Sequence, residues 1–227
     1  MGESGVATNK LIVIEGLDGS GKATQARRLT KALVDREIPV REVSFPDYDS
    51  DSSALVRMYL NGELSDTPGG VNAYAASSFY AVDRYASFKK HWEKDYLAGH
   101  TILSTRYVSS NAIHQMSKLP ENQWDEYLRW LSDFEYGRLG LPRPDRIIFL
   151  NMSRAVADRL ILSRYHGDEE KKDLHEKDRT YLASCQRTAA YAAKAEGWSV
   201  VECDDGEAPL PLECITEKIL ALLDAEA

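Results

Sequence analysis

The sequence predicts an α/β protein in which helices flank a five-stranded, mainly parallel sheet. Short runs rich in β-branched residues alternate along the chain with longer stretches of helical periodicity, and a glycine-rich turn directly follows the first of those runs. Strands separated by helices are joined by right-handed crossovers, which leave a parallel sheet covered on both faces. Because ligands of such sheets bind at the carboxyl ends of the strands, we expect the functional residues there.

Five segments are predicted to be the strands. Residues 10–15 (KLIVIE) form a short, β-branched, apolar run that favours a buried strand. Residues 39–45 (PVREVSF) are predicted to form the second strand, which Pro46 ends. The other three predicted strands are residues 101–104, 146–150 and 198–203.

The predicted helices fill the stretches between these strands. Residues 22–36 place apolar side chains near a period of 3.6, and the aromatic-rich stretch 71–97 is predicted to form one long helix. The chain has no internal repeat and no low-complexity linker, so we expect residues 1–227 to form a single domain with a flexible tail at 1–9. The remaining predicted helices are residues 52–60, two segments within 109–137, and residues 155–162, 177–196 and 212–223.

Charge and composition narrow the classes of function. The 227 residues include 28 basic and 36 acidic side chains, a net charge of −8, which argues against a general binder of nucleic acids or anionic membranes. No apolar run approaches the roughly 20 residues that span a bilayer, and the first ten residues lack the apolar stretch of a secretory signal. Three sparse cysteines favour reduced thiols. We therefore expect a cytoplasmic protein that binds neither nucleic acid nor membrane.

The glycine-rich turn after the first strand has the spacing G-x-x-x-x-G-K. Glycines let successive backbone N–H groups wrap a phosphate, and the helix that begins at Lys22 adds the positive end of its dipole. The Lys22 ammonium supplies a cation for the β- and γ-phosphates. The turn is therefore predicted to be a phosphate loop that binds a nucleoside triphosphate through Gly16, Gly19, Ser20, Gly21, Lys22, Ala23 and Thr24.

One position in this loop departs from the usual pattern. The residue after Lys22 is Ala23, where a Ser or Thr hydroxyl commonly ligates Mg²⁺. Thr24 lies one position on, about 100° further around the helix, and cannot simply substitute. Since Mg²⁺ often keeps several waters and binds substrate phosphates, a water could fill the missing position. We expect weaker metal binding without loss of nucleotide binding.

Five segments in combination resemble the thymidylate kinase family. They are IEGLDGSGKATQ, FPD after the second strand, FYAVDRY in the long helix, TRYVSSNAIHQ after the third strand, and an arginine-rich segment before the last two helices. The resemblance runs from Leu11 to about Cys203. It implies a P-loop fold with a five-stranded parallel sheet and a helical lid, transfer of the γ-phosphoryl group of ATP to dTMP, Mg²⁺ as cofactor, and a homodimer.

The resemblance also implies an acceptor site. Asp18 is similar to the family carboxylate that contacts the deoxyribose 3′-hydroxyl, and Phe45 to the aromatic floor of the site. Tyr80 and Arg84, four residues apart and so on one helix face, resemble the aromatic that stacks on thymine and the arginine that reaches its carbonyl. The structural alternatives stay open: a loop-capping Asp, a core Phe, a core Tyr and a surface Arg–Glu pair.

Further acceptor residues follow the third strand. Arg106 resembles the arginine that bridges donor and acceptor phosphates. Asn111 follows at the family spacing and can read the imide edge of thymine, because its amide carries both an acceptor and donors. Ser110 and Gln115 complete the predicted substrate-binding set, although Ser110 could instead serve as a local helix cap.

Two more positions differ from the family pattern. Thr105 precedes Arg106 where the family has an Asp that helps to hold Mg²⁺ or to organise phosphates. Asp47 stands where related chains often have an arginine for the dTMP phosphate. Glu15 is the nearest remaining carboxylate in the sequence, but the sequence assigns no metal ligand. We expect these differences to affect turnover more than the fold.

A charged segment, RYHGDEEKKDLHEKD, resembles the family lid and places the predicted lid at about residues 164–176. Phosphoryl transfer needs cations around the transferring group, and the phosphate loop has no arginine of its own. Arg159 and Arg164 are therefore predicted to supply catalytic charge, together with Lys22 and Arg106. The alternative is a solvated, charged loop.

Two other functions stay open from the sequence. The Tyr80 hydroxyl and the altered phosphate-binding positions could accompany a kinase for another deoxynucleoside monophosphate. Ala23 and Thr105 could instead indicate a nucleotide-binding regulatory protein with weakened catalysis.

Overall fold

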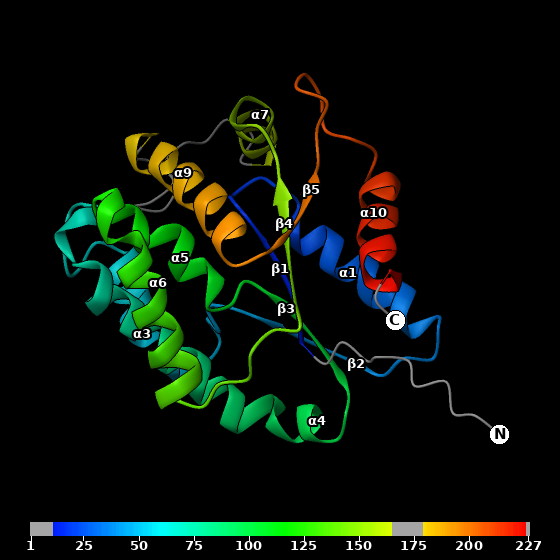
Figure 1. The fold of residues 1–227 in the computed structure, drawn as a ribbon, viewed down its shortest axis with the longest axis horizontal. Helices are drawn as coiled ribbons and strands as arrows, with labels where there is room; N and C mark the ends of the chain where they lie inside the picture. Colours follow the sequence, from blue (N-terminus) through cyan, green and yellow to red (C-terminus); the bar gives the residue numbers. More distant parts are fainter. Residues whose placement is uncertain (1–10, 165–178, 226–227) are drawn as a thin grey trace.

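A five-stranded parallel sheet forms the centre of the computed structural model, which describes residues 11–164 and 179–225 (Figure 1). The strand order is β2-β3-β1-β4-β5, and every neighbouring pair is parallel. This confirms the predicted fold class and all five predicted strands. The strands are β1 (Leu11–Gly16), β2 (Val40–Ser44), β3 (Thr101–Thr105), β4 (Arg146–Asn151) and β5 (Ser199–Glu202).

Strand β1 occupies the middle of the sheet and is buried along its whole length. Its apolar side chains alternate between the two faces, as the twofold period of a strand requires. Leu11 and Val13 join one hydrophobic cluster, whereas Ile12 and Ile14 join the other. Both faces therefore need a helical cover, which explains why a continuous apolar run forms this strand.

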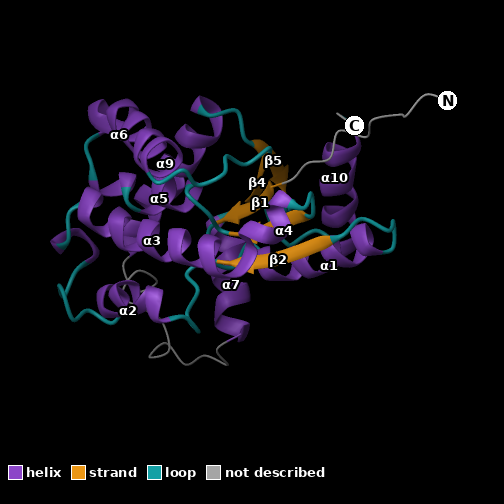
Figure 2. Cartoon of the chain, turned by 90° about the horizontal axis from the view of Figure 1, so that it is seen from below, coloured by secondary structure: helices purple, strands orange, loops and turns teal. Residues whose placement is uncertain are grey.

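Two groups of helices supply that cover. On one face α1 (Lys22–Val34) packs against α10 (Leu212–Asp224), and the carboxyl-terminal part of the chain thus lies beside its first helix (Figure 1). Figure 2 shows the other group after a 90° turn. It comprises α3 (Ala73–Ser87), α5 (Ser109–His114), α6 (Trp124–Ser132) and α9 (Arg179–Ala195).

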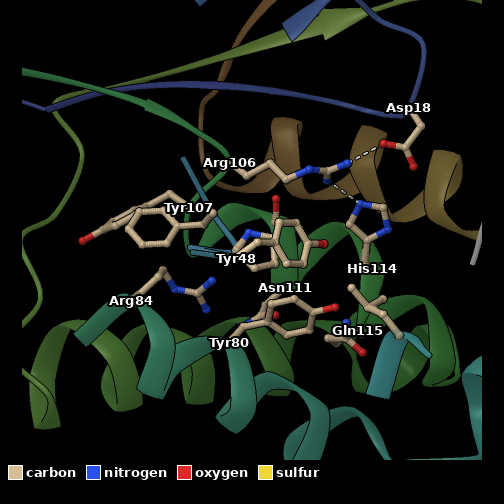
Figure 3. Close-up of a pocket in the computed structure, with 13 residues that line it drawn as sticks. Asp18, Tyr48, Tyr80, Arg84, Arg106, Tyr107, Asn111, His114 and Gln115 are labelled. Carbon is tan, nitrogen blue, oxygen red and sulfur yellow. Dashed lines mark hydrogen bonds and ion pairs between the residues drawn. The ribbon is translucent and has the colours of Figure 1, made fainter. Parts of the chain in front are cut away.

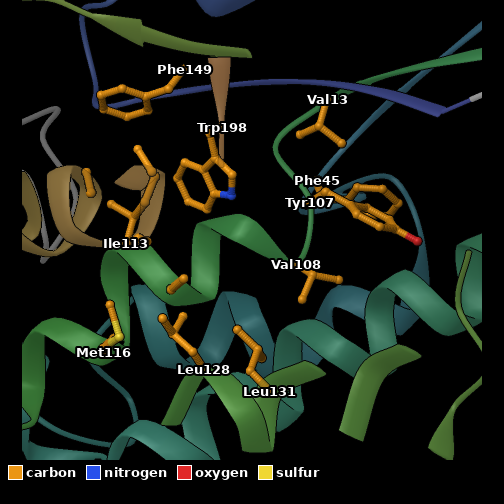
Figure 4. Close-up of a cluster of buried hydrophobic side chains, with 14 of the residues drawn as sticks. Val13, Phe45, Tyr107, Val108, Ile113, Met116, Leu128, Leu131, Phe149 and Trp198 are labelled. Atoms are coloured by element: carbon orange, nitrogen blue, oxygen red, sulfur yellow. The ribbon is translucent and has the colours of Figure 1, made fainter. Parts of the chain in front are cut away.

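The cluster on this second face is rich in large aromatic side chains (Figure 4). Trp92 and Tyr107 are almost completely buried in it, and their ring centroids lie 6.4 Å apart. The cluster joins residues of β1, β3 and β4 to the helices that follow β3. It therefore fixes the position of α5, which begins just past the carboxyl end of that strand.

The single long helix predicted at residues 71–97 is interrupted. A π-helical turn at Phe88–Trp92 separates α3 from α4 (Glu93–Leu97). In this wider turn the ring centroids of Phe88 and Trp92 lie 4.6 Å apart, and both side chains are buried. A second π-helical segment, Asp133–Arg138, extends α6.

The other helices match their predictions closely. They are α2 (Ala54–Leu60) and α7 (Arg154–Arg164). The predicted tail at 1–9 and almost all of the predicted lid at 164–176 fall outside the described residues. No helix in the described ranges is long and apolar enough to cross a membrane.

Lys118 ties the segment after α5 to two other parts of the chain. Its ammonium donates to the Tyr59 hydroxyl of α2 at 2.7 Å and to the Val71 carbonyl, just before α3, at 3.0 Å. It also lies 4.8 Å from the centroid of the Tyr59 ring, a cation–π contact. Burial disfavours the charged form and lowers the pKa of Lys118 to about 8.

This pKa gives the stability of the protein a distinct dependence on pH. Between about pH 8 and the unfolded-state lysine pKa of about 10.4, the folded chain has lost a proton that the unfolded chain still holds. The contribution of Lys118 to stability therefore rises with pH in that window. From about pH 7.5 to about 10.5, we expect the free energy of unfolding of the wild type to rise by about 2–3 kcal/mol relative to Lys118→Met.

Urea unfolding of both proteins at the two pH values measures this difference, and the other titrating groups cancel because both proteins contain them. A difference that stays constant with pH would show that the two hydrogen bonds and the ring keep Lys118 charged, and would contradict the expectation.

Candidate active site

The turn between β1 and α1 requires glycine at defined places. Gly19 has a φ of +83°, a left-handed conformation that side chains rarely adopt, and a Cβ there would lie 2.9 Å from the Ala157 carbonyl oxygen. A Cβ on Gly16 would lie 2.4 Å from the Ser20 hydroxyl. The loop thus runs close against α7 while its backbone wraps toward the start of α1, the shape expected of a phosphate loop.

Lys22 lies folded over this loop. Its ammonium donates to the Gly16 and Leu17 carbonyls, both at 2.9 Å, and lies 3.8 Å from a carboxylate oxygen of Asp18. The Ser20 hydroxyl is buried and has no hydrogen-bond partner among the described residues. Ala23 is exposed at the start of α1 and Thr24 is half-buried. The loop therefore holds one cation on its own carbonyl groups and presents one unsatisfied hydroxyl.

Glu15, the last side chain before the loop, is completely buried. One of its oxygens accepts from the Ser109 hydroxyl at 2.9 Å, the Ser110 hydroxyl at 2.6 Å and the Tyr107 N–H at 3.2 Å. Its other oxygen accepts from the Gly16 N–H at 3.2 Å. In this structure Ser110 therefore bonds to Glu15, although it also lines the pocket described below.

These bonds bear on whether the residues present suit a magnesium ion. Within residues 11–164 and 179–225, no group of three or more His, Cys, Asp or Glu side chains could hold a metal ion. The Glu15 carboxylate already accepts four hydrogen bonds, and Asp18 is bonded to Arg106. The described residues thus offer no ready set of protein ligands.

A pocket opens beside the loop, at the carboxyl ends of the strands (Figure 3). Its cavity volume is about 180 Å³. All eight residues predicted to bind the acceptor line it: Asp18, Phe45, Tyr80, Arg84, Arg106, Ser110, Asn111 and Gln115. The structure therefore brings the whole predicted set together, while the contacts with a substrate stay predictions.

At the loop end of this pocket, the guanidinium of Arg106 lies between two side chains (Figure 3). It donates to Asp18 at 2.5 Å and to the Nε2 of His114 at 2.9 Å. Burial alone would lower the pKa of Arg106, but the nearby Asp18 and Glu15 carboxylates outweigh burial and raise it. The backbone of Arg106 has a left-handed φ of +64°, so the residue departs sharply from the direction of β3.

His114 is a pocket residue that the sequence argument missed. Because arginine can only donate, its bond to Nε2 requires the neutral ring with the proton on Nδ1, which lies 3.6 Å from the Cys185 sulfur. The signal was present in the spacing: His114 follows Asn111 by three residues on α5, so both lie on one helix face. Tyr48 is a second missed lining residue.

At the opposite end, Arg84 pairs with a glutamate that the sequence argument also missed. Glu135 accepts from the Nε of Arg84 at 2.7 Å and from its Nη2 at 2.6 Å, and both side chains are buried. Asn111 donates to the same carboxylate at 3.0 Å. The only sequence signal was a lone acid between two aromatics, Phe134 and Tyr136, in an otherwise helical stretch.

The remaining predicted pocket residues lie between these ends. The ring centroids of Phe45 and Tyr107 lie 5.9 Å apart. Those of Tyr80 and Tyr59 lie 6.4 Å apart, in an edge-to-face arrangement. Gln115 is buried, and its side-chain oxygen has no partner among the described residues. An unsatisfied buried acceptor on a pocket wall suits a ligand that donates a hydrogen bond.

Of the two arginines predicted to supply catalytic charge from the lid, Arg159 does not line the pocket. Arg159 is exposed on α7, and its guanidinium donates to the Glu207 carbonyl. Arg164 ends α7 at the limit of the described residues. Their catalytic roles stay predictions.

Several known proteins similar to this chain are thymidylate kinases. Those of two Mycobacterium tuberculosis strains are 33% identical over 193 residues, covering 83% of this chain and 87% of theirs. The thymidylate kinase of Caenorhabditis elegans is 30% identical over 158 residues, covering 65% of each chain. The solved thymidylate kinase of Candida albicans shares the fold, with a TM-score of 0.68 at 20% identity over 96% of this chain and 92% of that one.

The thymidylate kinase family model matches residues 14–219, from β1 into α10. This range contains both the phosphate loop and every residue of the pocket. On this match and on the identity with the Mycobacterium tuberculosis enzymes, the chain belongs to the thymidylate kinase family of phosphotransferases.

Proposed function

We propose that the protein transfers the γ-phosphoryl group of ATP to the phosphate of dTMP, yielding ADP and dTDP. The observation that carries this proposal is that one pocket next to the phosphate loop is lined by the whole predicted acceptor set. It lies at the carboxyl ends of parallel strands, where nucleotides bind in this class of sheet. Donor and acceptor would thus meet at the Asp18–Arg106 end of the pocket.

The donor phosphates bind to the backbone of the phosphate loop. Lys22 then exchanges its bonds to the Gly16 and Leu17 carbonyls for bonds to phosphate oxygens. The orphan Ser20 hydroxyl supplies a further donor. Such reactions depend on positioning and on stabilising negative charge rather than on covalent chemistry by the protein.

The acceptor nucleotide lies across the pocket. Tyr80 stacks on the base, Arg84 and Asn111 read its edge, and Asp18 receives the sugar hydroxyl. Arg106 is the cation for the acceptor phosphate, since its bonds to Asp18 and His114 hold the guanidinium where the pocket meets the loop. Arg159 and Arg164 provide further positive charge during transfer.

Magnesium enters this proposal with the ATP. The described residues offer no dedicated ligand set, so we expect phosphate oxygens and water to supply most of its coordination. The ion would neutralise phosphate charge during transfer.

We also propose that the protein is a cytoplasmic homodimer, as the family resemblance implies. Apolar side chains on the neighbouring helices α2 and α3 support association, since Leu55, Val82 and Tyr85 are 42%, 50% and 41% exposed. Free cysteines, two of them buried, suit a reducing compartment. The negative net charge is consistent with small-molecule substrates rather than nucleic acid.

A first prediction concerns the donor. Lys22→Ala deletes a cation whose attraction grows as charge develops on the transferring group, so kcat should fall by about 10²-fold or more. A coupled assay of ADP release with ATP and dTMP measures it. Lys31→Ala is the matched control, because Lys31 lies on the same helix but is exposed and pairs only with Asp35 in the described structure. Near-normal kcat in a folded Lys22→Ala protein would refute the loop assignment.

A second prediction concerns the acceptor. The wild type should prefer dTMP to dCMP, dAMP and dGMP, because a site that hydrogen-bonds one base leaves its polar groups unpaired with another, at about 1–3 kcal/mol for each group. Asn111→Ala should lower kcat/KM for dTMP about tenfold or more and for dCMP much less. If the wild type prefers another monophosphate, that nucleotide and not dTMP is the acceptor. If it phosphorylates none of the four, a regulatory nucleotide-binding protein is favoured.

A further inference from the structure

Glu135 lies behind the wall of the acceptor pocket rather than in it. The residue comes from the π-helical segment that extends α6, is completely buried, and is absent from the pocket lining. Its carboxylate nevertheless bonds to two pocket residues at once, Arg84 of α3 and Asn111 of α5. One buried acid thus connects both side chains proposed to read the base.

The first consequence is a fixed orientation for the Asn111 amide. Its nitrogen donates to Glu135 at 3.0 Å and to the Ser77 carbonyl at 3.3 Å, so both amide hydrogens are used. A flipped amide would turn its oxygen toward two other acceptors, a carboxylate and a carbonyl, and would lose both bonds. The Asn111 oxygen is therefore the atom left for the pocket, where it can only accept.

The second consequence concerns Arg84. Glu135 engages its Nε and Nη2 in a bidentate pair, which holds the plane of the guanidinium. The Nη1 nitrogen is outside this pair and can only donate. Figure 3 shows that Arg84 and Asn111 approach the same cavity from neighbouring helices, with Tyr80 beside them. The pocket wall thus presents a donor next to an acceptor.

From this geometry we infer that Glu135 is a positioning residue that sets the base preference of the site. The inference rests on the proposed function. A donor beside an acceptor complements a base edge with a carbonyl next to a ring N–H, as in thymine. Cytosine presents the reverse, an amino group next to an unprotonated ring nitrogen. Its amino group would face the Arg84 donor, and its ring nitrogen would face the Asn111 oxygen. Glu135 favours thymine because it prevents the Asn111 amide from turning over.

Glutamine at position 135 removes the feature that maintains this order. Its amide has one acceptor and one donor group, so it cannot accept from both Arg84 nitrogens and Asn111 without a donor facing a donor. Since Nη2 of Arg84 and the Asn111 amide share one carboxylate oxygen, the glutamine carbonyl takes that place and its NH₂ group faces the Nε of Arg84. The guanidinium then turns out of the plane in which it donates to the base carbonyl. In Glu135→Gln the ratio of kcat/KM for dTMP to that for dCMP should fall at least tenfold, through a higher KM for dTMP and with kcat changed less than threefold.

Two further variants separate positioning from stability. Asp133→Asn is the matched control, since Asp133 belongs to the same π-helical segment but is exposed in a pair with Arg138, and it should leave the ratio unchanged. Glu135→Asp keeps the buried charge but is one methylene shorter. It should recover most of the melting temperature lost in Glu135→Gln while the ratio stays at least threefold below the wild type.

The assays distinguish this inference from the proposed function. Both the inference and the proposed function are supported if the wild type prefers dTMP and the dTMP-to-dCMP ratio of kcat/KM falls in Glu135→Gln and stays reduced in Glu135→Asp. A wild type that prefers dTMP, with folded Glu135 variants that keep its ratio, overturns the inference and leaves the function intact. If Glu135→Gln does not fold, the ratio in Glu135→Asp decides, and a wild-type ratio there overturns the inference. A wild type that phosphorylates no pyrimidine monophosphate overturns both.

Discussion

The central position of β1 is the constraint on which the remaining structure depends. Its parallel pairing with β3 on one side and β4 on the other aligns Ile14 with both Thr105 and Ile148. The phosphate loop and the segment that carries Arg106 must therefore leave the sheet at the same edge. A shift of one residue in this pairing would send the alternating side chains of β1 to the wrong faces and separate Asp18 from Arg106.

Buried charge organises the site beyond that edge. Glu15 accepts hydrogen bonds from two hydroxyls and two backbone N–H groups, and so connects the end of β1 to the start of α5. Arg106 adds a second connection through Asp18 and His114. Both charged side chains are thus paired with groups from other elements of the fold. The helix that bears Asn111 is thus held by polar bonds at its start and by Lys118 beyond its end.

The sequence predicted the sheet and the phosphate loop because their signals are local, whereas the acceptor set was predicted from the family resemblance. Strand runs, glycine spacing and the i, i+4 pair of Tyr80 and Arg84 need no knowledge of distant residues. Glu135 was not predicted because its contact with Arg84 spans 51 positions of the chain. His114 shares a helix face with Asn111, but its spacing alone does not reveal its bond to Arg106. The π-helical turn at Phe88–Trp92 was not predicted either, because packing of its aromatic rings, and not helix propensity, favours it.

The buried trio of Arg84, Asn111 and Glu135 also limits how the protein could diverge. A single exchange in the trio leaves a buried charge or amide without its partner, so each exchange alone is costly. The effects of combined exchanges will not add, because the three side chains share one carboxylate. A lineage that adopts a different base must therefore change several residues together, whereas the exposed surface around α10 and β5 is open to stepwise drift.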